Sequence, residues 1–241
     1  MRLLVSVRNL KEAHVAAGAG VDIVDLKEPN AGALGMVGPS TVSEVSQSLE
    51  GCEREPRPKL SIALGEVTDW THREVPQIPS VQYAKLGLAG LKDESNWEDQ
   101  WLKTRASFEQ RIVQVTNWVA VCYADHEAAL APSPESILEA ARNTGCRFLL
   151  FDTWNKRNGR LWDHLSPGRL TKLIELAHQH DLQVAVAGRL KASDIPRAAE
   201  VGADIFAVRS AACEQHNRTG FVSASCIEHL QESILSAASR S

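Results

Sequence analysis

Short apolar runs recur along the chain, and most of them are bounded by Gly, Pro, Asp or Asn. Their lengths suit β-strands, and in several of them apolar and polar positions alternate. Eight such runs are present: Leu3–Val7, Asp22–Lys27, Leu60–Gly65, Val81–Gly87, Trp118–Tyr123, Phe148–Asp152, Gln183–Ala187 and Asp204–Val208. The pattern therefore predicts eight strands.

Segments with helical character separate most of these strands. They are Asn9–Ala19, Ser40–Leu49, Ser95–Gln110, Ser133–Asn143, Gly168–His180, Ser193–Val201 and Cys226–Ala238. Gly20 and Gly145 follow two of them, and Pro134 occupies a first-turn position, as is typical of helix ends. The third crossover, Glu66–Ser80, carries two prolines and is predicted to be the weakest helix.

The alternation of strand and helix predicts parallel strands joined by crossovers. Eight such units in 241 residues favour an α/β fold of the (β/α)8 TIM-barrel type, with residues 1–241 as one catalytic domain. An open, doubly wound sheet is the alternative. Its glycine-rich fingerprint is absent after the first strand, where the sequence reads Val7-Arg8-Asn9.

Charge and cysteine usage narrow the class of protein. The net charge of −4 argues against nucleic acid or an anionic membrane as a partner. The five cysteines include no CxxC pair, so neither a disulfide framework nor a zinc site is expected. No long apolar run and no targeting leader are evident, because Met1–Val7 enters a strand directly. A cytoplasmic protein is therefore expected.

Charged residues stand at the ends of three predicted strands. Barrel active sites lie at the carboxyl ends of the strands, and strand residues alternate between the barrel interior and the helix layer. This alternation places Asp25 and Lys27 on the inner face of the second strand and Lys85 on that of the fourth. Asp152 ends the sixth strand facing inward, and Lys156 follows on the next loop.

Buried lysines among carboxylates suggest carbonyl chemistry. A low dielectric favours neutral lysine, which attacks carbonyls and forms a Schiff base, while a nearby carboxylate can move protons. We therefore predict Schiff-base chemistry with Lys27 foremost. The alternative is an ion-pair network that only fills the barrel. The glycine-rich loop Glu28–Gly35 is equally compatible with closure over a substrate and with an ordinary connection.

The ends of the seventh and eighth strands predict a phosphate site. Gly188 and Arg189 follow the seventh strand, and Arg209 and Ser210 follow the eighth. Glycine allows close backbone approach, free amides at a helix start bind anions, and Arg189 or Arg209 adds charge. The alternative is a simple turn with a solvated arginine. Ser6, inward on the first strand, is a further candidate substrate contact.

Three blocks of sequence resemble one known family. Asp25-Leu26-Lys27-Glu28-Pro29, followed by Gly32-Ala33-Leu34-Gly35, resembles the opening of the (5-formylfuran-3-yl)methyl phosphate synthase family. Tyr83–Gly87 resembles its strand-four motif, and Asp152-Thr153 with Lys156 resembles its third block. The resemblance covers essentially the whole chain.

This resemblance implies a barrel lyase of methanofuran-type cofactor biosynthesis, which in bacteria accompanies one-carbon metabolism. Such enzymes condense two molecules of glyceraldehyde 3-phosphate into a furan aldehyde phosphate, releasing phosphate and water. By the resemblance, Lys27 is the Schiff-base residue and Lys85 a proton acceptor, and Asp152 and Lys156 lie in the active site. No metal or organic cofactor is expected.

Two other functions remain alternatives. A different Schiff-base aldolase acting on a small sugar phosphate would share Lys27 but would form no furan. A barrel that only binds a metabolite, with its lysines held in ion pairs, would not need Lys27 for binding. The sequence is compatible with a homo-oligomer but shows no recognisable interface.

Overall fold

Eight strands close into a barrel in the order in which they occur in the chain. The computed structural model describes residues 1–239. Its strands are β1 (Arg2–Val7), β2 (Ile23–Leu26), β3 (Lys59–Glu66), β4 (Val81–Gly87), β5 (Val115–Tyr123), β6 (Phe148–Asp152), β7 (Gln183–Val186) and β8 (Ile205–Val208). All neighbours pair in parallel, and β1 pairs with β8. The predicted TIM barrel is confirmed, and the open sheet is excluded.

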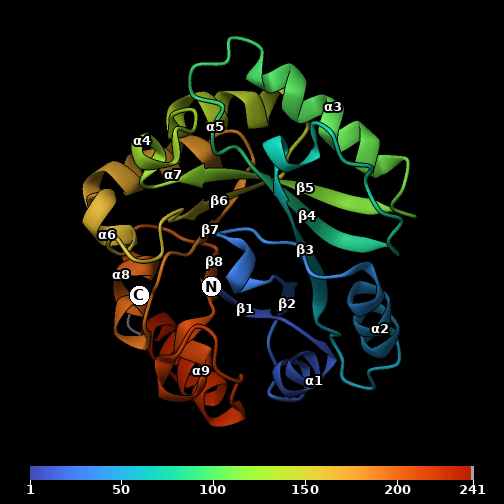
Figure 1. Ribbon diagram of the computed structural model, residues 1–241. Coiled ribbons are helices and arrows are strands. Elements are labelled where there is room, and N and C mark those ends of the chain that lie inside the picture. The colour runs from blue at the N-terminus through green and yellow to red at the C-terminus, as the bar shows by residue number, and fades with distance from the viewer. Residues whose placement is uncertain (240–241) are drawn as a thin grey trace.

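Helices surround the barrel on the outside (Figure 1). They are α1 (Leu10–Gly18), α2 (Pro39–Glu50), α3 (Trp97–Glu109), α4 (His126–Ala129), α5 (Pro134–Asn143), α6 (Leu161–His164), α7 (Pro167–His178), α8 (Ile195–Glu200) and α9 (Ala224–Ala238). Short 3-10 helices lie in the loops: η1 (Pro29–Ala31), η2 (Val67–Trp70), η3 (Ala192–Asp194), η4 (Ser210–Ala212) and η5 (Glu214–His216). Each helical segment predicted outside the third crossover contains an α-helix, with small shifts at its ends.

Capping side chains start several of these helices where the sequence suggested. The Ser133 side chain accepts a hydrogen bond from the Ser136 amide, and Pro134 opens the first turn of α5. Asn9 caps α1 in the same way by accepting from the Glu12 amide. These caps satisfy backbone N–H groups that have no partner inside the helix.

The third crossover differs from the others. Within the described chain it holds no α-helix, only the single turn η2, and Ile78 further along forms a parallel bridge with Ile112. Pro76 and Pro79 lie in this segment. Proline lacks the N–H that a helix interior needs, so a helix cannot extend through them. The prediction that this is the weakest helix is confirmed.

Two apolar layers leave one end of the barrel free for polar side chains. Outward strand residues such as Val24 and Leu86 pack against the helices. Inward residues such as Leu4, Ile23 and Leu150 fill the amino-terminal half of the barrel. The polar inward residues lie beyond them, toward the carboxyl ends of the strands. Among residues 1–239, no helix is both long and apolar enough to cross a membrane.

Candidate active site

Asp25 is the centre of a buried hydrogen-bond network at the floor of the site. Its Oδ1 accepts from Ser61 Oγ at 2.7 Å and from Lys85 Nζ, and its Oδ2 accepts from Ser6 Oγ at 3.0 Å. Burial alone would raise the pKa of Asp25, but the charges of Lys85 and Lys27 outweigh it and lower that pKa. Asp25 is therefore an ionised carboxylate that holds Lys85 in place.

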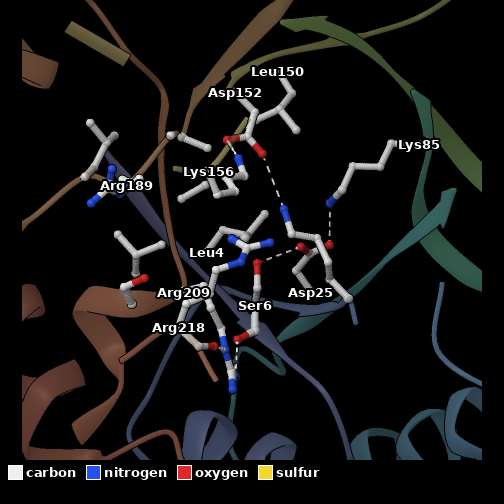
Figure 2. Close-up of a pocket in the computed structure, with 17 residues that line it drawn as sticks. Leu4, Ser6, Asp25, Lys85, Leu150, Asp152, Lys156, Arg189, Arg209 and Arg218 are labelled. Carbon is white, nitrogen blue, oxygen red and sulfur yellow. Dashed lines mark hydrogen bonds and ion pairs between the residues drawn. The ribbon is translucent and has the colours of Figure 1, made fainter. Parts of the chain in front are cut away.

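Asp152 is the second anchor, and it contacts two lysines. Its Oδ2 accepts from Lys27 Nζ at 3.3 Å, and its Oδ1 accepts from Lys156 Nζ and from the Thr153 amide at 2.8 Å. Figure 2 shows Lys156 beside Asp152, with Lys85 pointing to Asp25. Burial opposes ionisation, yet Lys156 and Lys27 hold the pKa of Asp152 well below its usual range. Asp152 thus stays a carboxylate between two amines.

Two of the lysines are poised toward the neutral form. Burial lowers the pKa of Lys27, and the Asp152 carboxylate offsets this only in part. Burial likewise lowers the pKa of Lys156 to about 7, again against the pull of Asp152. Lys27 makes one long contact, whereas Lys85 also donates to Ser61 Oγ at 3.2 Å. Lys27 is therefore the less firmly held amine.

One pocket collects every site residue that the sequence singled out (Figure 2). These residues are Ser6, Asp25, Lys27, Lys85, Asp152, Lys156, Gly188, Arg189, Arg209 and Ser210. The inward faces of β1, β2, β4 and β6 supply the charged floor, and the segments after β7 and β8 supply one wall. Their convergence bears out the geometry expected from strand alternation, while their catalytic roles stay predictions.

The segments after β7 and β8 offer unpaired backbone donors. Among the described residues, no group accepts a hydrogen bond from the amides of Gly188, Arg189 or Ser210. We call these three residues the phosphate rim. Gly188 has φ +105, and a Cβ there would lie 3.1 Å from Thr153 Cγ2, so glycine is required. Unpaired amides at such a turn suit an anion.

Arg209 lines the pocket, but its guanidinium is fully engaged. It donates to both carboxylate oxygens of the buried Glu12, at 2.5 and 2.9 Å, and to the carbonyl oxygens of Ser6, Gly220 and Arg218. A phosphate contact would have to displace one of these partners. Of the two arginines that the sequence offered for phosphate, Arg189 is therefore the available one, and Arg209 is a positioning residue.

Arg218 lines the same pocket and was missed by the sequence analysis. Its Nη2 donates to the Gly32 carbonyl oxygen at 3.3 Å, which joins the loop after β8 to the loop after β2. Arg218 lies in an irregular segment beyond η5, where no periodic pattern indicates which way a side chain faces. Only its nearness to η4, at the expected phosphate site, was a signal.

A Glu66–Tyr123 pair at the ends of β3 and β5 was also missed. Tyr123 Oη donates to Glu66 Oε1 at 2.5 Å, and the Ala89 amide donates to Glu66 Oε2 at 3.0 Å. Burial raises the pKa of both groups. A Cβ at Gly87 would overlap the Glu66 carboxyl group and lie 2.5 Å from Tyr123 Oη. Gly87, at the end of the Tyr83–Gly87 block, was the available signal.

Comparison with solved structures supports the fold. The chain superimposes on phosphoribosyl anthranilate isomerase from Thermus thermophilus with a TM-score of 0.59 at 12% identity, covering 98% of this chain and 99% of that one. The 3-hexulose-6-phosphate synthase from Salmonella typhimurium gives 0.53 at 16% identity, covering 98% and 100%. At such low identity these similarities establish the barrel alone.

Sequence comparison identifies the family. A Methanopyrus kandleri (5-formylfuran-3-yl)methyl phosphate synthase is 33% identical, over 97% of this chain and 98% of the relative. A synthase of the same name from Methanocaldococcus jannaschii is 30% identical, over 96% and 99%. The model of the 4-HFC-P synthase family matches residues 3–231. The chain therefore belongs to the 4-HFC-P synthase family, whose curated relatives are (5-formylfuran-3-yl)methyl phosphate synthases.

Proposed function

We propose that this chain is a (5-formylfuran-3-yl)methyl phosphate synthase, a lyase that condenses two molecules of glyceraldehyde 3-phosphate through a Schiff base on Lys27. The product would serve the biosynthesis of a methanofuran-type cofactor. The observation that carries the proposal is Lys27 itself: a buried amine with a lowered pKa whose ammonium group donates, among the described residues, to Asp152 alone, at 3.3 Å. It lies in the pocket of a chain whose relatives bear that name.

The first step would be attack of neutral Lys27 on the aldehyde carbon of one triose phosphate. Loss of water gives a positively charged iminium, which acidifies the neighbouring C–H bond. Removal of that proton leaves an enamine. The enamine must then expel phosphate and attack the aldehyde of the second triose, in either order, and the net loss of two waters forms the aromatic furan. Hydrolysis of the C=N bond to Lys27 releases the aldehyde of the product and restores the free amine.

The geometry assigns different tasks to the charged groups. Asp152 stays ionised, so it would stabilise the iminium on Lys27 rather than store a proton. Lys156, with a pKa of about 7, would accept and return protons near neutral pH. Lys85, which is held by Asp25 and Ser61, would transfer protons on the opposite side of the substrate. The phosphate rim, which includes Arg189, would hold the phosphate of the triose that is joined to Lys27.

The test is to incubate the purified protein with glyceraldehyde 3-phosphate and to follow furan absorbance and product mass. We expect a furan aldehyde phosphate from the wild type and none from Lys27→Arg. Lys172→Arg, on the exposed face of α7, is the matched control and should retain wild-type activity. An aldol without furan would indicate a simple aldolase. Turnover by Lys27→Arg would rule out the Schiff base.

A further inference from the structure

A second pocket adjoins the site and is strongly basic. The charged members of its lining are Lys156, Arg160, Asp163, Arg189, Lys191 and Arg218. We call it the outer pocket. It shares Lys156, Arg189, Leu190, Ser210 and Arg218 with the inner pocket that holds Lys27, so the two are continuous. The loops after β6, β7 and β8 form its walls.

The charge of this lining is unusual for the chain. Five lysines and arginines face a single carboxylate, Asp163, although the whole chain carries a net charge of −4. Asp163 already has a partner at the start of α6, because its Oδ2 accepts a hydrogen bond from the Arg160 amide at 2.7 Å. The outer pocket therefore concentrates positive charge on an otherwise acidic protein.

Most of these cations have no anionic partner. Among residues 1–239, no carboxylate forms an ion pair with Arg189, Lys191 or Arg218. Within that described range, the Arg189 guanidinium donates to the Gly159 carbonyl oxygen alone, at 3.4 Å. Arg160 reaches Asp194 Oδ2 only at 3.7 Å. Clustered cations repel one another, and a bound dianion would relieve that repulsion.

We propose that the outer pocket is a second phosphate subsite, which binds the phosphate of the second triose phosphate through Arg160, Lys191 and Arg218. The phosphate rim then holds the phosphate of the triose that is joined to Lys27. This inference rests on the proposed function, because that reaction brings two phosphorylated substrates together. Arg189 lines both pockets and lies on the side of the inner pocket away from Lys85 (Figure 2).

The arrangement also explains how two identical substrates take different roles. The inner pocket gives one aldehyde access to Lys27, and an anchor farther out holds the second triose away from Lys27. Guanidinium groups hold a phosphate at two oxygens, which orients the attached carbon chain. A second subsite therefore aligns the aldehyde of the second triose with the enamine instead of with Lys27.

Inorganic phosphate tests the subsite without any turnover. Titration followed by calorimetry should show two phosphate ions per chain for the wild type and one for Arg160→Ala/Lys191→Ala. The control Arg142→Ala/Lys172→Ala removes the same two residue types from exposed positions of α5 and α7 and should keep both ions. We call Arg160→Ala/Lys191→Ala the outer-pocket variant. A single ion on the wild type, or two ions on the outer-pocket variant, would overturn the proposal.

Kinetics with glyceraldehyde 3-phosphate distinguish binding of the first substrate molecule from binding of the second. In the outer-pocket variant the concentration that half-saturates the borohydride-trapped adduct on Lys27 should not change. The concentration that half-saturates furan formation should rise roughly tenfold or more, as expected for loss of charge-assisted hydrogen bonds. Equal shifts in both would contradict a separate subsite. A wild type that binds two phosphates but forms no furan would instead refute the proposed function.

Discussion

At the scale of single residues, the distinguishing feature of the site is one carboxylate that accepts hydrogen bonds from two lysine amines. Asp152 contacts both Lys27 and Lys156, and burial lowers the pKa of each amine against the effect of that carboxylate. The carboxylate therefore limits how far the amines can become neutral. Its charge therefore raises the pH at which Lys27 becomes a nucleophile above the pH that burial alone would give.

This balance predicts a pH shift in Asp152→Asn. The carboxylate of Asp152 raises the pKa of Lys27, so its removal lets burial lower that pKa further. The neutral amine is then present at lower pH. Trapping the adduct with borohydride across a pH series should show a midpoint displaced to lower pH relative to wild type. Asp181→Asn, an exposed charge loss beyond α7, is the control and should leave the midpoint in place. An upward displacement would contradict the account.

The residues of the lysine network were predictable because β-strands alternate. Asp25, Lys27, Lys85 and Asp152 lie in or next to strands, where the direction of one side chain determines that of the next. Arg218 and the partners of Arg209 lie in loops or on another element, where no such period applies. Their roles depend on contacts between segments far apart in the chain, which a sequence pattern does not reveal.

At the scale of elements, three neighbouring strands are fitted together at their carboxyl ends. Glu66 of β3 and Tyr123 of β5 meet across β4, and Gly87 of β4 leaves the space that they occupy. All three strands are predicted from the sequence, but a role for this glycine is not. Its importance appears only when its neighbours on both sides are known.

Gly87→Ala should therefore be damaging. The added methyl group would overlap Glu66 and crowd Tyr123, so we expect a loss of roughly 1–3 kcal/mol in unfolding free energy, as for overpacked cores. Gly168→Ala is the control. Gly168 belongs to α7, and a Cβ added there would have no atom within 4 Å. That variant should be neutral or gain up to about 1 kcal/mol. Urea unfolding measures both, and equal effects would contradict the packing argument.

At the scale of the whole molecule, a buried ion pair joins the last strand of the barrel to the first strand and its helix. Arg209, next to β8, binds Glu12 of α1 and the carbonyl oxygen of Ser6 in β1. Closure by eight repeated units could be predicted from the sequence, and it is confirmed. The ion pair that reinforces this closure could not, because it links residues 197 positions apart.

Glu12→Gln should destabilise the whole barrel. It leaves the Arg209 charge buried without its counter-ion, which typically lowers unfolding free energy by roughly 3–5 kcal/mol. Glu135→Gln disrupts the exposed ion pair with Arg169 and should change the unfolding free energy by no more than about 1 kcal/mol. Urea unfolding of the two variants gives the comparison. Similar small losses in both would show that the buried pair does not stabilise barrel closure.

The measurement that tests the central claim most directly is the location of the trapped adduct. The protein is incubated with glyceraldehyde 3-phosphate, reduced with borohydride, digested and analysed by mass spectrometry. The account predicts a triose adduct on the peptide that contains Lys27, with Lys85 and Lys156 unmodified. An adduct confined to Lys85 or Lys156, or no adduct under conditions in which furan forms, would contradict it.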